Sequence, residues 1–180
     1  MIDLWLPILV STIAIFFASF LSWMVVGLHE KDWVKLPQED EFMASVRTLD
    51  IPQGNYIYPG TITTKETNDP AFQQKYQTGP RGTLQVYPLV NMGRNLGLTF
   101  LFFLGCNVTF AYLASFALTP EEDFITVFRF VATIALLTFL GSIVQHAIWF
   151  RIRIAGHIIE SIAYAVIAGA VFASMWPANS

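Results

Sequence analysis

The sequence predicts an all-α membrane protein with four transmembrane helices and a long cytoplasmic loop that contains a short helix and a small β-hairpin. Three observations predict this fold class. Hydrophobic residues make up 54% of the chain and charged residues only 13%, whereas a soluble domain carries about 25% charged residues. Four long apolar runs hold very few charges, and six of the nine prolines fall in the polar stretch between the first two runs.

The first apolar run, residues 4–28, contains no charged residue. A helix rises 1.5 Å per residue, and about 20 apolar residues span the hydrocarbon core of a bilayer. This run is therefore long enough to cross a membrane with some tilt. It lacks the basic region and the small-residue cleavage site of a secretory signal peptide, so we expect it to stay on the mature protein.

Three further apolar runs predict transmembrane helices over residues 93–118, 124–150 and 155–176. The second run has no charge between Asn95 and Pro120, the third carries Arg129 near its start, and the fourth carries Glu160. Each run has the length that a membrane span requires.

The distribution of basic residues predicts the orientation of the spans. With four spans, the loop 29–92 and the turn 151–156 lie on one side, and both termini lie on the other. Nine of the ten Lys and Arg residues fall on the first side, and only Arg129 falls on the second. Basic residues near span ends are retained in the cytoplasm, so we expect a cytoplasmic loop and termini on the opposite face.

The loop 29–92 is the only sizeable polar segment. Pro37 followed by three acidic residues is typical of a helix start, because both favour the first turn, and we expect this helix to run from about residue 36 to 49. Residues 55–58 and 83–87 are strand-forming runs that can pair as a hairpin, with a short helix at 70–77 between them. The loop has too few large aliphatic residues to form a sizeable hydrophobic core of its own. We therefore expect it to pack on the membrane face or on a partner.

Four short motifs resemble a group of small bacterial multi-span membrane proteins that carry no assigned function. They are Lys35-Leu36-Pro37 with Glu39-Asp40, Ile51-Pro52-Gln53-Gly54-Asn55-Tyr56, Gly79-Pro80-Arg81-Gly82, and Trp176-Pro177. The resemblance implies a bacterial inner (cytoplasmic) membrane, and in such a membrane the distribution of basic residues predicts periplasmic termini. It implies no activity, because the motifs are those of turns and helix starts.

Charge and cysteine content exclude two classes of interaction. The net charge is −3, so the basic footprint that phosphate backbones require is missing and nucleic acid is not an expected partner. The single cysteine, Cys106, cannot form an intrachain disulfide.

Arg129 is the basic residue inside the third predicted span. Ionisable groups within spans are functional candidates by default, but its long side chain can reach outward to the acidic turn at residues 121–123. We expect Arg129 to anchor the helix at the interface, and a substrate or ion-pathway role is the alternative.

Three histidines and one glutamate are expected at the cytoplasmic ends of the helices: His29, His146, His157 and Glu160. His157 and Glu160 share a helix face because they are three residues apart. Such a group can bind a metal, ligate a haem through two histidines, or relay protons in a quinone-related role. The simpler interpretation is that all four are interfacial residues with no ligand.

Small and aromatic residues predict how the helices pack and where they meet the interface. Ala165, Gly169 and Ala173, and likewise Ala14, Ala18 and Ser22, recur every four residues, a spacing that lets helix backbones approach closely in lipid. Asn107 is expected to form a hydrogen bond to a neighbouring helix. Tryptophans are expected to anchor the spans at the membrane interfaces: Trp5, Trp23, Trp33, Trp149 and Trp176.

Two hypotheses for function follow from these observations. The first is a non-catalytic accessory or structural subunit of a larger bacterial inner-membrane complex, for which an electron-transfer complex is one candidate. Its partners are other membrane subunits and the lipid bilayer, and it needs no cofactor. The second is a small membrane redox, metal or haem protein that uses His146, His157, Glu160 and His29. We favour the first because no complete site is evident, and we set a transporter below both because no internal repeat or pair of broken helices is seen.

Overall fold

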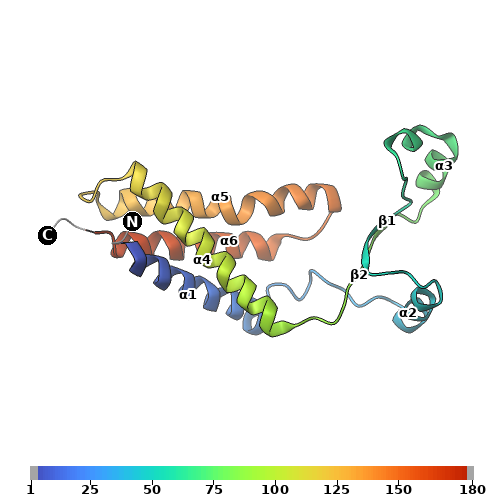
Figure 1. Ribbon diagram of the computed structural model, residues 1–180, viewed down its shortest axis with the longest axis horizontal. Coiled ribbons are helices and arrows are strands. Elements are labelled where there is room, and N and C mark those ends of the chain that lie inside the picture. Colours follow the sequence, from blue (N-terminus) through green and yellow to red (C-terminus); the bar gives the residue numbers. More distant parts are fainter. Residues whose placement is uncertain (1–3, 178–180) are drawn as a thin grey trace. The chain divides into compact units, whose positions relative to one another are not determined.

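The computed structural model describes residues 4–177 and divides into two compact units (Figure 1). The helical unit combines the chain up to Val34 with the chain from Met92 onward, and the loop unit comprises Lys35–Asn91. The two units are described separately below.

Four helices of the helical unit are long and apolar enough to cross a membrane. They are α1 (Trp5–Leu21), continued by the π-helical turn η2 (Ser22–Val26), α4 (Met92–Ala117), α5 (Phe124–Phe150) and α6 (Ala155–Ser174). The four spans expected from the apolar runs are therefore confirmed as helices with the length and composition of membrane spans.

Local signals explain where α5 begins and ends. The Asp123 carboxylate accepts hydrogen bonds from the backbone N–H groups of Ile125 (2.7 Å) and Thr126 (3.0 Å), which caps the helix start. At the other end Arg151 adopts a left-handed conformation with φ 53°, and the chain turns back into α6. This short turn makes α5 and α6 neighbours in sequence and in space.

The core of the helical unit is built around α6. Figure 1 shows α5 and α6 running side by side, and α6 also packs against α1. Ala165, Gly169 and Ala173 are all buried. A Cβ atom on Gly169 would lie 2.9 Å from the Ala132 Cβ of α5, so the backbones of α5 and α6 approach closely where α6 has no side chain.

The first helix uses a different set of residues in its packing. Its buried residues are Pro7, Ser11, Thr12 and Ile15. Ala14 and Ala18 are half-buried, and Ser22 is buried in the π-turn.

Asn107 does not make the hydrogen bond to a neighbouring helix that the sequence suggested. It is fully buried, but its side-chain amide donates to the Phe103 carbonyl of the same helix at 2.9 Å. A carbonyl one turn earlier is always within reach of a short polar side chain in a helix, so the local bond forms first.

The tryptophans occupy varied environments. Trp5, Trp33 and Trp149 are exposed, whereas Trp176 is half-buried and its indole N–H donates to the Thr119 carbonyl at 2.9 Å. That bond joins the end of α6 to the turn before α5.

The loop unit contains two short helices and a two-stranded antiparallel sheet. Its elements are α2 (Glu39–Thr48), β1 (Gly54–Tyr58), the 3₁₀ helix η3 (Thr64–Asn68), α3 (Pro70–Thr78) and β2 (Gly82–Val86). Tyr56 pairs with Leu84 at the centre of the sheet. The expected hairpin, with a helix between its strands, is confirmed.

The first helix of the loop unit begins later than expected. Gln38 takes a left-handed conformation with φ 57°, and α2 starts at Glu39. Pro37 therefore lies before the helix rather than in its first turn. The three acidic residues expected in the first turn do lie there, where they complement the helix dipole.

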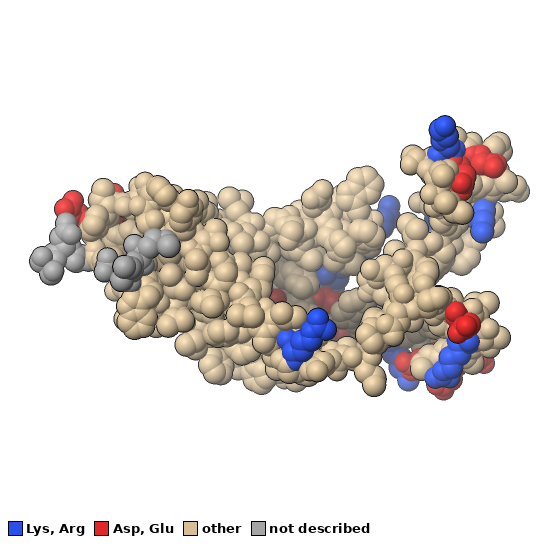
Figure 2. Space-filling model, viewed as in Figure 1, with Lys and Arg blue, Asp and Glu red and all other residues tan. Residues whose placement is uncertain are grey.

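The loop unit has almost no core. The cluster of buried apolar residues lies wholly within the helical unit, and the only buried position in 35–91 is Pro59. Figure 2 shows charged groups spread over the loop unit, whereas long stretches of the helical surface carry none. An isolated two-stranded hairpin is marginally stable in water, so the loop unit depends on local hydrogen bonds or on a surface outside it.

Candidate functional site

A cluster of buried ionisable side chains lies where the chain leaves the first span and where α6 begins. The Nδ1 atom of His29 lies 2.6 Å from Asp32 Oδ2, and its Nε2 atom lies 3.2 Å from Glu160 Oε2. His157 Nδ1 is 3.9 Å from the same Glu160 oxygen, and Arg153 Nε is 3.8 Å from Asp32 Oδ1. We call the four residues His29, Asp32, His157 and Glu160 the His–carboxylate cluster.

The end of the first span positions His29. The π-turn η2 widens the last turn of the helix, and Gly27 then takes a left-handed conformation with φ 66°. A β-carbon is disfavoured at such a φ, so glycine suits the position. A tight turn follows, in which the backbone N–H of Asp32 donates to the His29 carbonyl at 3.0 Å. This turn brings the Asp32 carboxylate back to the imidazole.

The start of α6 is shaped to receive His29. A Cβ atom on Gly156 would lie 2.8 Å from His29 Cε1 and 3.0 Å from the Leu28 carbonyl oxygen. Real side chains do not approach so closely, so glycine is required at this position for the imidazole to sit against the helix. Glu160 and His157 then face the same imidazole from the first turns of α6.

Aromatic rings complete the surroundings of His29. The Trp23 indole stacks on the imidazole with centroids 3.9 Å apart and an interplanar angle of 13°. The His157 ring lies on another side, with its centroid 4.5 Å from that of His29. As a result only 4% of His29 is exposed, although Trp23 itself is about half exposed.

Hydrogen bonding within the cluster is incomplete. His29 Nε2, Asp32 Oδ1 and Glu160 Oε1 are buried and have no hydrogen-bond partner among the described residues. His29 Nε2 is close to Glu160, but the two groups are not aligned for a hydrogen bond. A buried polar atom without a partner costs about 1–3 kcal/mol, so the three atoms give the cluster the capacity to bind a further polar group or ion.

The contact with Asp32 favours one tautomer of the His29 ring. Nδ1–H can donate a hydrogen bond to the Asp32 carboxylate, and in the neutral imidazole this leaves a lone pair on Nε2. The Nε2 atom lies 3.2 Å from Glu160 Oε2. The arrangement can therefore hold either a proton or a cation at Nε2.

The structure brings together three of the four residues singled out in the sequence. His29, His157 and Glu160 lie in the cluster, whereas His146 is exposed on α5 and its ring lies against Phe150 at 4.4 Å. His146 does not join the cluster, because depth along a helix does not fix the face on which a side chain lies. The imidazoles of His29 and His157 are too close for a porphyrin to fit between them.

Sequence analysis missed Asp32. Only 7% of its side chain is exposed, and the carboxylate contacts His29. A histidine followed three residues later by an aspartate, directly after the glycine that ends a span, is the signal that could have identified the pair.

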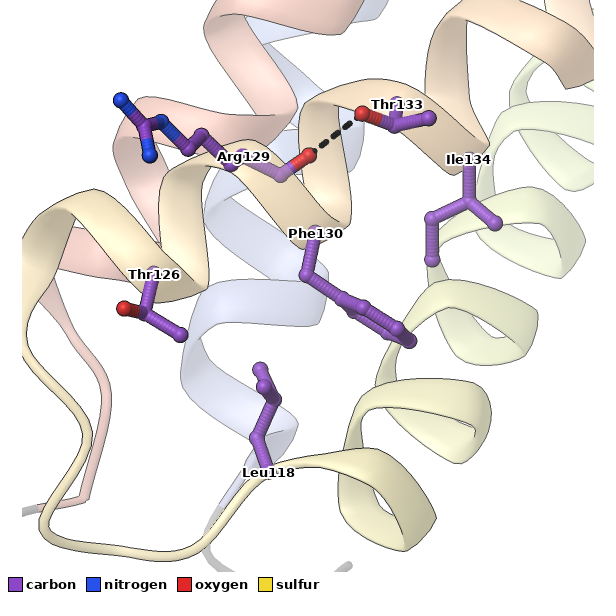
Figure 3. Close-up of a pocket in the computed structure, with 6 residues that line it drawn as sticks. All are labelled: Leu118, Thr126, Arg129, Phe130, Thr133 and Ile134. Carbon is purple, nitrogen blue, oxygen red and sulfur yellow. Dashed lines mark hydrogen bonds between the residues drawn. The ribbon is translucent and has the colours of Figure 1, made fainter.

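Arg129 lines a separate shallow groove. The groove is formed by Leu118, Thr126, Arg129, Phe130, Thr133 and Ile134. Figure 3 shows Phe130 and Leu118 directed toward the groove, whereas the Arg129 guanidinium extends away from them. Three of its lining residues are apolar and three are polar or charged, and the guanidinium does not lie over the apolar part of the groove.

Comparison with known proteins does not assign the chain to a group. No family model matches it, and no match is found among curated proteins or solved structures.

Proposed function

We propose that the protein is a non-catalytic accessory subunit of a larger bacterial inner-membrane complex, with an electron-transfer complex as one candidate. In this proposal the helical unit anchors the protein in the membrane and the cytoplasmic loop unit binds the partner. The observation that carries the proposal is the absence of a core in the loop unit.

The loop unit exposes the apolar side chains that a docking surface needs. Ile62 is 96% exposed and Leu89 fully exposed, and Leu49 and Ile57 are each about two-thirds exposed. Isolated exposed apolar residues are common, but this unit, which has almost no buried core, shows them on α2, β1, α3 and the connecting segments. Burial of these side chains against a second protein would supply the apolar contact that the unit lacks.

The helical unit supports the anchoring role. It has a continuous buried core and four helices suited to a membrane. The nine-to-one distribution of basic residues favours a cytoplasmic loop unit and periplasmic termini.

The experiment is purification of the full chain in a mild detergent from its own membranes, followed by native mass determination and identification of bound proteins. Replacement of Ile57, Ile62 and Leu89 by serine is expected to release the partner while the thermal transition of the helical unit is unchanged. The matched control replaces the exposed polar residues Gln53 and Lys65 by serine and is expected to retain the partner. A wild-type protein that purifies alone, or a partner retained by the apolar variant, would contradict the proposal.

A further inference from the structure

We propose that the His–carboxylate cluster binds one divalent transition-metal ion, with His29 Nε2, His157 Nδ1 and Glu160 as ligands and with Asp32 as the residue that orients His29. This inference is independent of the accessory-subunit proposal. It concerns the helical unit alone.

The distances between donor atoms suit a single ion. Ligand atoms bound at about 2.0–2.2 Å to one tetrahedral ion lie about 3.3–3.5 Å from one another. The distance from His29 Nε2 to Glu160 Oε2 is 3.2 Å, and that from His157 Nδ1 to the same oxygen is 3.9 Å. A group that includes Asp32 in place of Glu160, namely His29, Asp32 and His157, also offers ligand atoms that all lie within 4.8 Å of one another. Binding of one ion by the proposed three donors therefore requires the His157 ring to move closer to Glu160.

Asp32 occupies the position of a carboxylate that supports a metal ligand. Histidine ligands usually donate their second ring N–H to a carboxylate, which fixes the tautomer and strengthens the ligand. His29 Nδ1 lies 2.6 Å from Asp32 Oδ2. This contact leaves the lone pair on Nε2, which is the ring atom that lies 3.2 Å from Glu160 Oε2.

A proton alone satisfies the cluster less well than a metal ion. Protonation of His29 Nε2 would provide one donor, but Glu160 Oε1 would still have no hydrogen-bond partner among the described residues. A metal ion would instead bind the Glu160 carboxylate directly. With three protein ligands, a tetrahedral ion would have a fourth position for a water molecule, which can donate hydrogen bonds.

The ligand set selects the class of metal. Two imidazoles with one carboxylate favour zinc, cobalt, nickel, copper or iron, whereas Ca²⁺ and Mg²⁺ prefer oxygen ligands alone. Bound there, the ion would join the segment after the first span to the start of α6. It would thus fix two helices that are far apart in the sequence.

The test uses the full-length protein purified with an affinity tag that contains no histidine and stripped of metal with a chelator. Addition of Co²⁺ is expected to give visible ligand-field absorption that saturates at one ion per chain. Zn²⁺ is expected to displace the Co²⁺ signal and to raise the thermal transition, and Mg²⁺ is expected to do neither.

Variants assign the ligands. His157→Gln and Glu160→Gln are each expected to abolish the saturable Co²⁺ signal, and Asp32→Asn is expected to weaken binding about 10–100-fold while leaving the ligands in place. His146→Gln is the matched control because it removes the third histidine, which lies outside the cluster, and it is expected to bind Co²⁺ as the wild type does.

His157 is the most exposed ligand, with 30% of its side chain accessible, so His157→Gln is the variant best able to fold. Its helical circular dichroism reports whether it has folded. Wild-type protein that shows no saturable Co²⁺ absorption, or folded His157→Gln with unchanged Co²⁺ affinity, would overturn the assignment. Loss of binding in His146→Gln alone would overturn it as well.

Discussion

The two units of this protein distribute polar and apolar groups in opposite ways. The helical unit is apolar in composition yet buries His29, Asp32 and Glu160 at one place. The loop unit is polar in composition yet leaves Ile62 and Leu89 uncovered. Average hydropathy thus distinguishes the two units, and the exceptions within each unit are the places where we propose that it binds an ion or a partner.

The units also differ in what holds them together. The helical unit is held by close packing of α5, α6 and α1, whereas the side-chain hydrogen bonds of the loop unit join near neighbours. Thr63, for example, donates to Glu66, and the Asp69 carboxylate caps α3 by accepting from the Ala71 N–H. Substitutions should therefore be costly in the helical unit and cheap in the loop unit unless a partner is present.

The largest expected effect concerns the side of the membrane on which the loop unit lies. We expect the loop unit and the two chain ends to lie on opposite sides. Alkaline phosphatase fused after Ser180 should be active, because the termini are expected in the periplasm, and the same enzyme inserted near Thr67 should be inactive. The reverse pattern of activity would place the loop unit outside the cytoplasm. It would thereby contradict the proposal that the loop unit binds a partner on the cytoplasmic side.

Gly169→Leu should separate α5 from α6. A Cβ at this position already lies 2.9 Å from Ala132 Cβ, and overpacking costs about 1–3 kcal/mol or more. We expect a lower thermal transition in detergent and poor recovery of folded protein. Gly141→Leu on α5 is the control, since a Cβ there meets no atom within 4 Å, and equal damage in both variants would show that helix packing at Gly169 is not special.

Gly156→Ala should disturb the cluster without removing any of its side chains. The added methyl would displace the His29 ring or the Leu28 carbonyl, at a cost of about 1–3 kcal/mol. A lower thermal transition than that of Gly105→Ala, which meets open space, is the expected result. Equal thermal transition temperatures for the two variants would show that the His29 ring is not in close contact with α6 at Gly156.

The smallest expected effect is a pH dependence at the start of α5. Hydrogen bonds from the Thr126 backbone N–H and hydroxyl hold the pKa of Asp123 below its ordinary value of 3.8. Since the folded pKa is the lower one, this carboxylate stabilises the helix fully above pH 3.8 and loses the effect as the pH falls through its folded pKa. Asp123→Asn keeps the capping oxygen but does not titrate, so its thermal transition should change less with acid than that of the wild type. Identical acid dependence in the two proteins would show that Asp123 makes no such contribution.

Much of the fold could be predicted because its signals are long or periodic. Runs of more than 20 apolar residues predict spans from length alone, and the alternating runs around Tyr56 and Leu84 predict paired strands. The start of α2 could not be predicted, because the left-handed conformation of Gln38 is a single-residue choice that no periodicity reports.

The candidate site was only partly predictable for a related reason. The sequence places His29 and His157 near the same end of the helices, but the face on which each side chain lies depends on the π-turn after α1 and on the close approach at Gly156. The same argument explains why His146, at the same end of the helices, lies outside the cluster, whereas the contact of Asp32 with His29 is local and follows from the turn after Gly27. The contact between His29 and α6 joins segments that are far apart in the chain. It depends on how the helices pack, and the pattern of residues in a single sequence does not specify that packing.

The most direct test of the central claim, that the loop unit binds a partner through exposed apolar side chains, is photo-crosslinking in living cells. A photoreactive amino acid is placed at Ile62 and, as the matched control, at the exposed polar residue Gln53. The account predicts that Ile62 yields one discrete protein adduct that Gln53 does not. Adducts with lipid alone at Ile62, or no adduct, would show that the loop unit lies on the membrane or in solvent and would contradict the account.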